Sequence, residues 1–383
     1  MQTKVNSLEE GKDGIFVIKT RGLPLKLLLI LSMLLVICAV FSFISANTFT
    51  HFGLDTALAV IKPNYEPCIG ATNSLVDWIR PPSSNLMHNL TDEQLFWRAT
   101  LVPRINKYPF PRKPKIAFMF LTKGPLPLAP LWERFFKGNE GRFSIYIHSM
   151  PGYTEDFSST SVFYRRNVPS KLAEWGQMSM CDAERRLLAN ALLDFSNEWF
   201  MLVSESCIPL YNFTVIYDYI SKSKYSFMGS IDELGPDGRG RYNENMAPEV
   251  NLTQWRKSSQ WFEINRRLAI NVVEDTFFYP KFKEFCKPNC YVDEHYFPTM
   301  LTMRSAHLLA NRSITLVDWS RGGAHPATFG SGDITIEFFE KILRGPTCKY
   351  NDGDSSMCFI FARKFAPSTL EPLLQLSPTV LGF

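Results

Sequence analysis

The sequence predicts an α/β domain built on a mostly parallel central sheet, and the order of its apolar runs carries that prediction. Residues 115–122, 143–149 and 199–206 are apolar runs of strand length. A helical pattern at 178–195 separates the second run from the third. Strands that alternate with helices are typical of α/β layers in which the strands run parallel. We place this domain at residues 113–383.

Further elements follow the third strand. Residues 214–221 predict a helix and residues 225–230 a short strand. The segment 232–254, rich in Gly, Asn, Pro and charge, predicts a long loop of the kind that forms a lid or a binding element. Residues 258–275 predict a polar turn that leads into a helix. Trp261, in that turn, is either a platform for a sugar ring or a core anchor.

Polar residues follow each of the three predicted strands, at 122–124, 148–149 and 204–206. The carboxyl ends of parallel strands meet at one edge of a sheet, where ligands bind in α/β folds. We therefore expect these three segments to share one rim.

An uncharged run precedes the domain. Residues 27–46 hold twenty residues without a charge, which is enough to cross a bilayer core. Lys19, Arg21 and Lys26 lie just before the run, and no Lys or Arg follows until Lys62. The positive-inside rule then predicts a cytoplasmic tail at 1–26, an uncleaved signal anchor and a lumenal remainder. Cleavage after Ser45-Ala46 is the alternative.

The segment 47–112 has the irregular, proline-punctuated composition of a stem that holds a domain away from a membrane. One helix is expected inside it. Thr91 precedes Asp92 and Glu93, and acidic residues favour the first turn of a helix.

Cysteines and sequons agree with a lumenal placement. Seven of the eight cysteines follow residue 46, and an oxidising compartment would let them pair. Cys286 with Cys290, and Cys348 with Cys358, are close enough for local disulfides, although the sequence leaves the connectivity open. Four Asn-x-Ser/Thr sequons also follow the anchor, at Asn89, Asn212, Asn251 and Asn311.

Charge and spacing exclude two classes of partner. The 41 basic and 37 acidic side chains nearly balance, so no overall field favours nucleic acid. The cysteine and histidine spacings do not match a zinc site. An Asp-x-Asp triplet of the kind that holds a metal in many sugar-nucleotide transferases occurs at 352–354, in a short polar loop where a solvated turn is the favoured interpretation.

The segment 286–299 holds the candidate general base. Asp293 and Glu294 precede an apolar, helix-compatible run. A carboxylate near the start of a helix stays ionised and can accept a proton from a bound hydroxyl. Helix capping is the alternative role for both residues. If no metal is present, cations must balance a leaving diphosphate, and Arg321, Arg363 and Lys364 are the candidates.

Seven stretches together resemble the core-2/I-branching β-1,6-N-acetylglucosaminyltransferase family, most closely its plant branch with the brittle-culm-type proteins. They are KIAFMFLTKGPLPLAPLWERFF, AEWGQMSMCDAERRLLANALLD, WFMLVSESCIPLYNF, SSQWFEINRR, CYVDEHYFPT, DWSRGGAHPATF and CFIFARKF. The resemblance covers residues 115–365. It implies a GT-A-type fold, a UDP-sugar donor, a glycan or glycoprotein acceptor, inversion at the anomeric carbon, no metal or other cofactor, and a Golgi membrane location.

The resemblance also implies roles for individual residues. The family's catalytic glutamate falls on Glu294, and its phosphate-binding lysine and arginine fall on Lys364 and Arg321. Substrate binding is assigned to Trp175, Gly176, Glu205, Gln260 and Trp261. Two alternatives stay open: a UDP-glucuronic acid-using enzyme of the same fold, for which Arg239, Arg241 or Lys257 would supply the extra cation, and a lumenal carbohydrate-binding protein without turnover.

Overall fold

The computed structural model describes residues 25–52, 85–101, 107–154, 156–287, 290–323 and 325–383. The chain divides into two compact units, Met1–Thr72 and Asn73–Phe383. Most of the predicted tail and part of the predicted stem, including Cys68, lie outside the described residues.

In the first unit the structure describes one helix, α1 (Leu25–Phe52). The predicted anchor falls within it. Side chains of α1 are described without interruption only over residues 32–43. Counting described residues alone, no helix is both long and apolar enough to cross a membrane. The anchor therefore stays a prediction.

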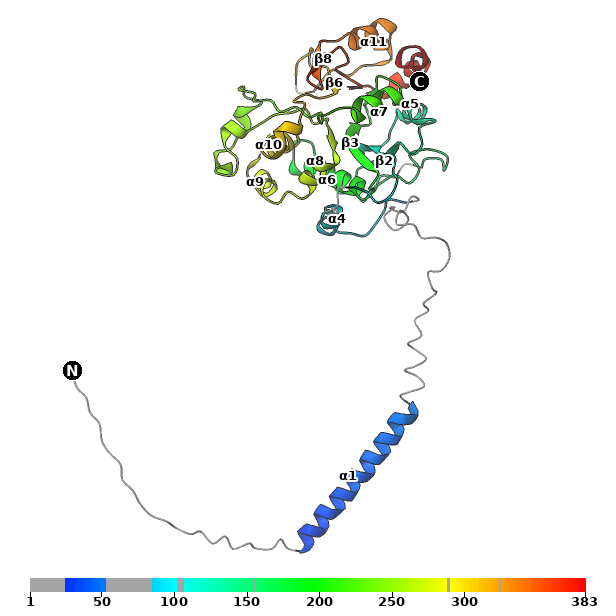
Figure 1. Cartoon of the computed structure of the whole chain (residues 1–383), viewed down its shortest axis with the longest axis vertical. Helices are drawn as coiled ribbons and strands as arrows, with labels where there is room; N and C mark the ends of the chain where they lie inside the picture. Colours follow the sequence, from blue (N-terminus) through cyan, green and yellow to red (C-terminus); the bar gives the residue numbers. More distant parts are fainter. Residues whose placement is uncertain (1–24, 53–84, 102–106, 155, 288–289, 324) are drawn as a thin grey trace, which may run out of the picture. The chain divides into compact units, whose positions relative to one another are not determined.

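The second unit is built on a four-stranded sheet with the order β2-β1-β3-β5 (Figure 1). Its strands are β1 (Lys115–Leu121), β2 (Phe143–His148), β3 (Asn197–Ser204) and β5 (Glu263–Asn265). The first three run parallel, and β5 is antiparallel to β3. This arrangement confirms the predicted α/β class with a mostly parallel sheet.

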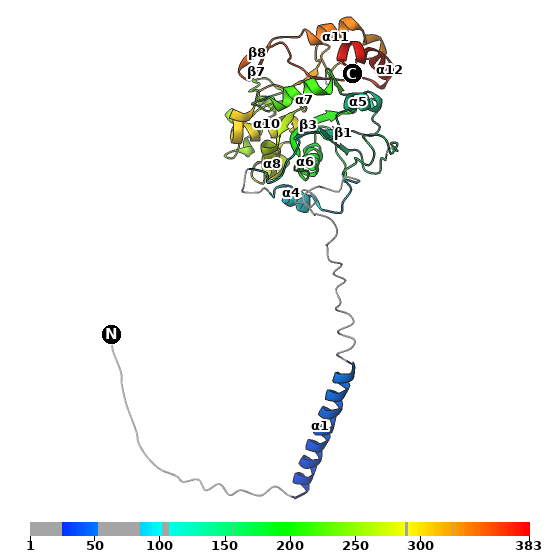
Figure 2. The same cartoon turned by 45° about the vertical axis from the view of Figure 1, so that its right-hand side comes forward.

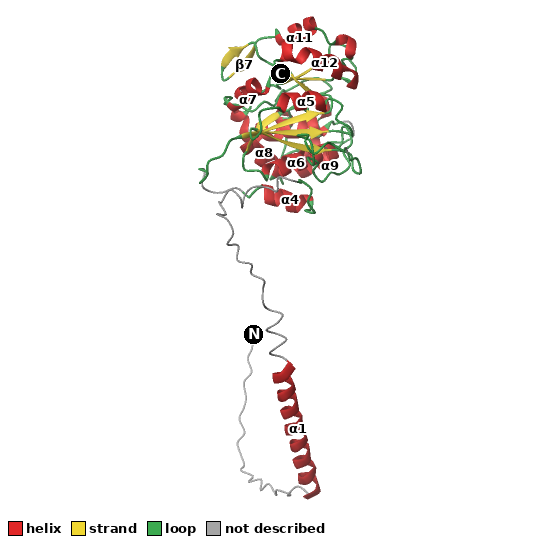
Figure 3. Cartoon of the chain, turned by 90° about the vertical axis from the view of Figure 1, so that its right-hand side faces the viewer, coloured by secondary structure: helices red, strands yellow, loops and turns green. Residues whose placement is uncertain are grey.

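Helices cover both faces of this sheet (Figure 3). On one face lie α5 (Ala129–Phe136) and α7 (Phe213–Ser221), while α6 (Met178–Leu192) lies on the other. The ring of Phe118 on β1 packs against Trp132 of α5, with 5.8 Å between centroids. Such edge-to-face aromatic contacts add to the hydrophobic stabilisation of the core.

The other strands of the described residues form a smaller sheet and a hairpin, of which the hairpin strands are labelled in Figure 2. In the small sheet β9 (Phe361–Arg363) lies between β4 (Ile208–Pro209) and β6 (Thr315–Val317). The hairpin pairs β7 (Cys348–Tyr350) with β8 (Gly353–Ser355). The remaining helices are α4 (Asp92–Ala99), α8 (Arg266–Val273), α9 (Phe278–Phe285), α10 (Val292–Ser305), α11 (Ile336–Leu343) and α12 (Leu370–Leu376), with short turns η1 (Arg239–Arg241), η2 (Glu244–Met246), η3 (Leu252–Gln254), η4 (Ala306–Leu308), η5 (Ser331–Asp333), η6 (Pro367–Thr369) and η7 (Ser377–Leu381).

The helix expected after Thr91 is α4. The Thr91 side chain accepts a hydrogen bond from the backbone N–H of Gln94, and the Gln94 side chain accepts one from Thr91 N–H. This reciprocal capping box satisfies donors that the first turn of a helix leaves free. Asp92 forms an ion pair with Arg186 of α6 at 2.9 Å, which fastens α4 to the α/β unit.

Two sequence predictions are wrong in detail. Residues 225–230 form only isolated bridges, with Ser226 opposite Leu309 and Phe227 opposite Glu263. The segment 258–275 contains the strand β5 before its helix. Both runs are short, so their own sequence does not decide whether they form strands. Residues 263–265 form a strand because they pair with β3, which lies far away in the sequence.

Two disulfides form, Cys286–Cys290 and Cys348–Cys358, which resolves the pairing that the sequence left open. The sequon residues differ in exposure. Asn212 is half-buried and caps α7 by accepting from Val215 N–H at 3.0 Å. The exposed sequon residues are Asn89, Asn251 and Asn311.

Candidate active site

The three predicted rim segments lie together. Leu121, the last residue of β1, is in register with His148 of β2 and with Ser204 of β3. Thr122 N–H donates to the carbonyl of His148 at 3.0 Å. Burial lowers the pKa of His148 to about 4, so this rim carries a neutral imidazole at physiological pH.

The candidate base Glu294 lies in the first turn of α10. Tyr291 precedes the helix in the left-handed region, with φ of 52°. The Glu294 carbonyl accepts a hydrogen bond from Ser258 N–H at 2.8 Å, which fixes the segment before β5 to the start of α10. The candidate base therefore lies on a helix, and its backbone is hydrogen-bonded to a second segment of the chain.

Two opposing effects set the charge state of Glu294. Burial raises its pKa, while the positive charges of Lys257 and Arg241 lower it. An Arg241 Nη1 atom lies 3.3 Å from Glu294 Oε2, and its Nη2 atom lies 2.7 Å from Asp237 Oδ1. A desolvated carboxylate held ionised by nearby cations is suited to accept a proton.

Aromatic side chains surround the entry to α10. The Tyr291 ring contacts the ring of Trp175 edge-on at 4.7 Å, and the Arg241 guanidinium lies over its face at 4.3 Å. Gly176 has a φ of +73°, and a Cβ atom there would lie 3.2 Å from the Tyr291 ring. Glycine is thus required at position 176 for both backbone and space. The Trp175 side chain stays 49% exposed.

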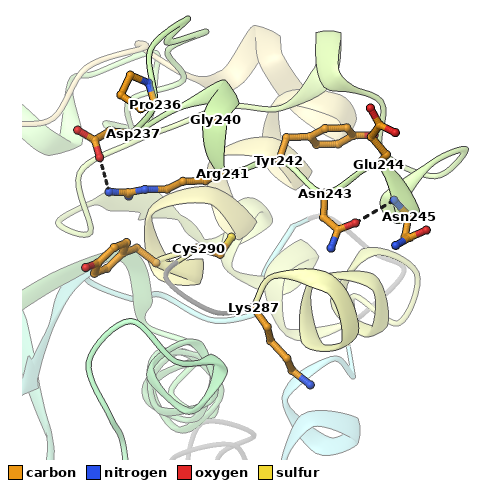
Figure 4. Close-up of a pocket in the computed structure, with 11 residues that line it drawn as sticks. Pro236, Asp237, Gly240, Arg241, Tyr242, Asn243, Glu244, Asn245, Lys287 and Cys290 are labelled. Atoms are coloured by element: carbon orange, nitrogen blue, oxygen red, sulfur yellow. Dashed lines mark hydrogen bonds and ion pairs between the residues drawn. The ribbon is translucent and has the colours of Figure 1, made fainter.

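A cavity of about 820 Å³ opens beside Arg241 and Tyr291 (Figure 4). Figure 4 shows the Arg241 side chain reaching toward Asp237, with Lys287 at a separate side of the cavity. Hydrogen-bonding side chains of both charge signs line it: Asp237, Arg241, Asn243, Glu244, Asn245 and Lys287. Such a lining suits a ligand rich in hydroxyl groups.

Gln260 points into the protein. Its Nε2 atom donates to Glu184 Oε1 of α6 at 2.8 Å. Gln260 therefore connects the segment before β5 to a buried carboxyl.

Trp261 takes the core-anchor alternative. Its side chain is only 4% exposed, and the Arg363 guanidinium lies over the ring at 4.0 Å. Burial lowers the pKa of Arg363, while the charge of Glu205 raises it. The structure thus groups Glu205, Trp261 and Arg363 as neighbours and leaves no open ring face on Trp261.

The two predicted diphosphate-binding cations are less enclosed. Lys364 directly follows β9 and is half-buried, and its ammonium has no hydrogen bond or ion pair within the described part of the chain. Arg321 is exposed in the turn after Trp319; hydrogen bonding from Ser320 lowers the pKa of Asp318, and the charge of Arg321 adds to this effect. Among described residues, no hydrogen bond or ion pair links either cation to Glu294.

The Asp-x-Asp triplet lies at the exposed turn of the β7–β8 hairpin. Asp352 accepts a hydrogen bond from Tyr225 and pairs with Lys224 at 3.3 Å, and Asp354 pairs with Lys349 at 2.6 Å. No group of three or more His, Cys, Asp or Glu side chains that could hold a metal occurs in the described residues.

Sequence reasoning did not assign a role to Tyr291 or Glu184. Tyr291 could have been noticed as the residue before the candidate base. Glu184 could have been noticed as a carboxylate in the otherwise apolar stripe of the helical pattern at 178–195.

Two comparisons with known proteins show what this chain is similar to. The model of the Core-2/I-Branching enzyme family matches residues 116–343. The chain is 37% identical to a rice protein (Oryza sativa subsp. japonica) named Glycosyltransferase BC10, over 70% of this chain and 77% of the relative. The residues matched by the family model include the rim, the entry to α10 and Glu294.

Proposed function

The chain belongs to the Core-2/I-Branching enzyme family, and from this premise we propose that it moves N-acetylglucosamine from a UDP-sugar to a glycan or glycoprotein hydroxyl. It is a glycosyltransferase. The observation that carries the mechanism is Glu294, a largely buried carboxylate at the start of α10 that faces two cations.

In the proposed reaction, Glu294 accepts the proton of an acceptor hydroxyl while that oxygen attacks the anomeric carbon of the donor. The bond from this carbon to the diphosphate breaks, and UDP leaves with the electron pair. A single displacement of this kind inverts the anomeric configuration. General-base assistance contributes about 10²- to 10⁴-fold in rate.

Lys364 and Arg321 are proposed to balance the charge of the leaving diphosphate without a metal. Lys364 supports this proposal because its ammonium is not used by any described neighbour. Fixed cations directed at developing negative charge stabilise a transition state as a metal would.

The polar cavity beside Arg241 is proposed to hold the acceptor. Arg241 lines this cavity and also contacts Glu294, so the cavity lies beside the candidate base. The side chains that line it can exchange hydrogen bonds with sugar hydroxyls. The exposed ring of Trp175, beside Tyr291, offers an apolar face on which a sugar ring can pack.

The cellular setting is part of the proposal. The uncharged run at 27–46 and the cations before it support a single-pass type II anchor with a lumenal catalytic domain. Two disulfides and three exposed sequon residues suit the lumen of the secretory pathway. Golgi residence follows from this layout and from the family.

One observation favours a second donor. Among the cations considered for a uronate, Arg241 contacts Glu294 and so lies beside the centre at which donor and acceptor would react. A UDP-glucuronic acid-using enzyme of the same fold is therefore the second candidate. The presence of both Glu294 and Lys364 argues against a binding protein without turnover.

The test incubates a secreted fragment, residues 47–383, with a panel of UDP-sugars in EDTA and measures UDP release. We expect release from UDP-N-acetylglucosamine that resists EDTA and falls about 10²- to 10⁴-fold in Glu294→Gln. Donor binding, measured on the same samples, should be unchanged by that substitution. An unaffected Glu294→Gln enzyme would disprove the assignment of the base.

A further inference from the structure

Two buried carboxyl groups lie behind Glu294. Asp293, the residue before it, is 5% exposed, and Glu184 on the facing helix α6 is fully buried. Gln260 donates to Glu184 Oε1, whereas Glu184 Oε2 and Asp293 Oδ1 have no hydrogen-bond partner among the described residues. A buried ionised carboxylate without partners is very costly, so these groups are arranged to hold protons.

The electrostatics agree with this geometry. Burial raises the pKa of Glu184 well above its ordinary value, and the neighbouring Asp293 raises it further. Burial raises the pKa of Asp293 to about 7, with the charge of Glu294 adding to the effect. Three carboxyls in one desolvated cluster cannot all be ionised at neutral pH.

We propose that Glu184 and Asp293 are a protonated carboxyl pair behind Glu294, and that loss of the Asp293 proton makes Glu294 a stronger base. The proposal rests on the proposed role of Glu294. It makes Asp293 a positioning residue that acts through the base, and Glu184 a buried neutral acid on the facing helix α6.

The other charges around the cluster explain why the protons stay on these two groups. Arg241 and Lys257 face Glu294 from the loop side and favour its ionised form, whereas α6 presents the acidic groups Asp182 and Glu184 together with the cation Arg185. Burial lowers the pKa of His295 to about 3, so this neighbour is neutral. Besides one another, the groups coupled to Glu184, Asp293 or Glu294 are Cys181, Asp237, Arg241 and Lys257, while Asp182 and Arg185 of α6 act on Cys181.

The first test is thermal stability against pH for wild type, Asp293→Asn and Glu184→Gln. A carboxyl whose pKa is raised by folding stabilises the protein below the unfolded value, and that stability is lost as the pH rises to the folded value. The melting temperature of Asp293→Asn minus that of wild type should therefore increase as the pH rises from about 4 to about 7, and should then level off. Glu184→Gln should continue to gain above the pH at which Asp293→Asn levels off.

The second test is the pH profile of kcat/KM. Wild type should show a second rise of a few-fold near pH 7, because a newly charged Asp293 increases the proton affinity of Glu294. Asp293→Asn should lose this rise. Below about pH 6, where Asp293 of the wild type is protonated, the two enzymes should have similar activity. Glu184→Gln should retain the rise. A matched control is Glu263→Gln: burial raises the pKa of Glu263, on β5, to about 8, and its carboxyl group accepts a hydrogen bond from Phe227 N–H.

The outcomes separate this inference from the proposed function. Melting differences that do not vary with pH, or a second rise that persists in Asp293→Asn, would overturn the inference. An active Glu294→Gln enzyme would overturn the proposed base, and the melting measurements would still report on the proton pair. Loss of the rise in Asp293→Asn alone, with Glu263→Gln like wild type, supports the inference.

Discussion

Two pairs of acidic residues in this chain show how much a carboxylate depends on its surroundings. Asp293 and Glu294 lie at the start of α10, where burial raises the pKa of both. Asp352 and Asp354 lie at the turn of a hairpin, where each is paired with a lysine in solvent. The first pair is desolvated, whereas the second pair is neutralised by its lysine partners.

The cations follow the same division. Lys224 and Lys349 form ion pairs with the two hairpin carboxylates. Lys364, half-buried after β9, has no such partner in the described residues. Residue type alone would have favoured the Asp-x-Asp triplet for diphosphate binding, and the placement of charges favours Lys364.

The largest effect that separates these two regions is expected from Lys364→Ala. A charge-assisted hydrogen bond contributes about 1.5–3 kcal/mol, so the donor dissociation constant should rise about 10- to 100-fold. Lys349→Ala is the matched control and should leave donor binding unchanged. Isothermal titration with the UDP-sugar measures both. Added Mn²⁺ should not restore affinity, and restoration would contradict a metal-free diphosphate site.

A smaller effect is expected from Arg241→Gln. Arg241 lowers the pKa of Glu294, so its removal should raise that pKa and move the acid limb of the kcat/KM profile to higher pH. Activity should fall roughly fivefold at pH 6 and recover toward pH 8. Arg239→Gln is the control, since Arg239 lies on the same short turn and pairs with Asp232. A uniform loss across the pH range would contradict an effect that acts through Glu294.

Most of the fold could be predicted because its signals are local. The apolar runs at 115–122, 143–149 and 199–206 became β1, β2 and β3 of one parallel sheet, with their polar ends on one rim. Strand β5 was not predicted, because its three residues form a strand only through pairing with β3. A pairing partner more than sixty positions away leaves no pattern in a short window.

The site was only partly predictable for a related reason. Family motifs and a helix start sufficed to select Glu294. Its surroundings come from distant segments: Arg241 of a loop pairs with Glu294 and covers the Tyr291 ring, and Gln260 ties Glu184 of α6 to the segment before β5. Sequence patterns cannot supply distances between such segments. Burial of Trp261 under Arg363 was undecided for the same reason.

The smallest effect is expected from the double variant Asp352→Asn, Asp354→Asn. Both carboxylates are solvated, and hydrogen bonding to Tyr225 lowers the pKa of Asp352 without involving any group near Glu294. Turnover and donor binding should each change by less than about twofold, because surface substitutions away from a site rarely do more. UDP-release assays with and without Mn²⁺ measure this. A large loss of activity that depends on Mn²⁺ would make the hairpin a metal site and would remove the contrast between the two acidic pairs.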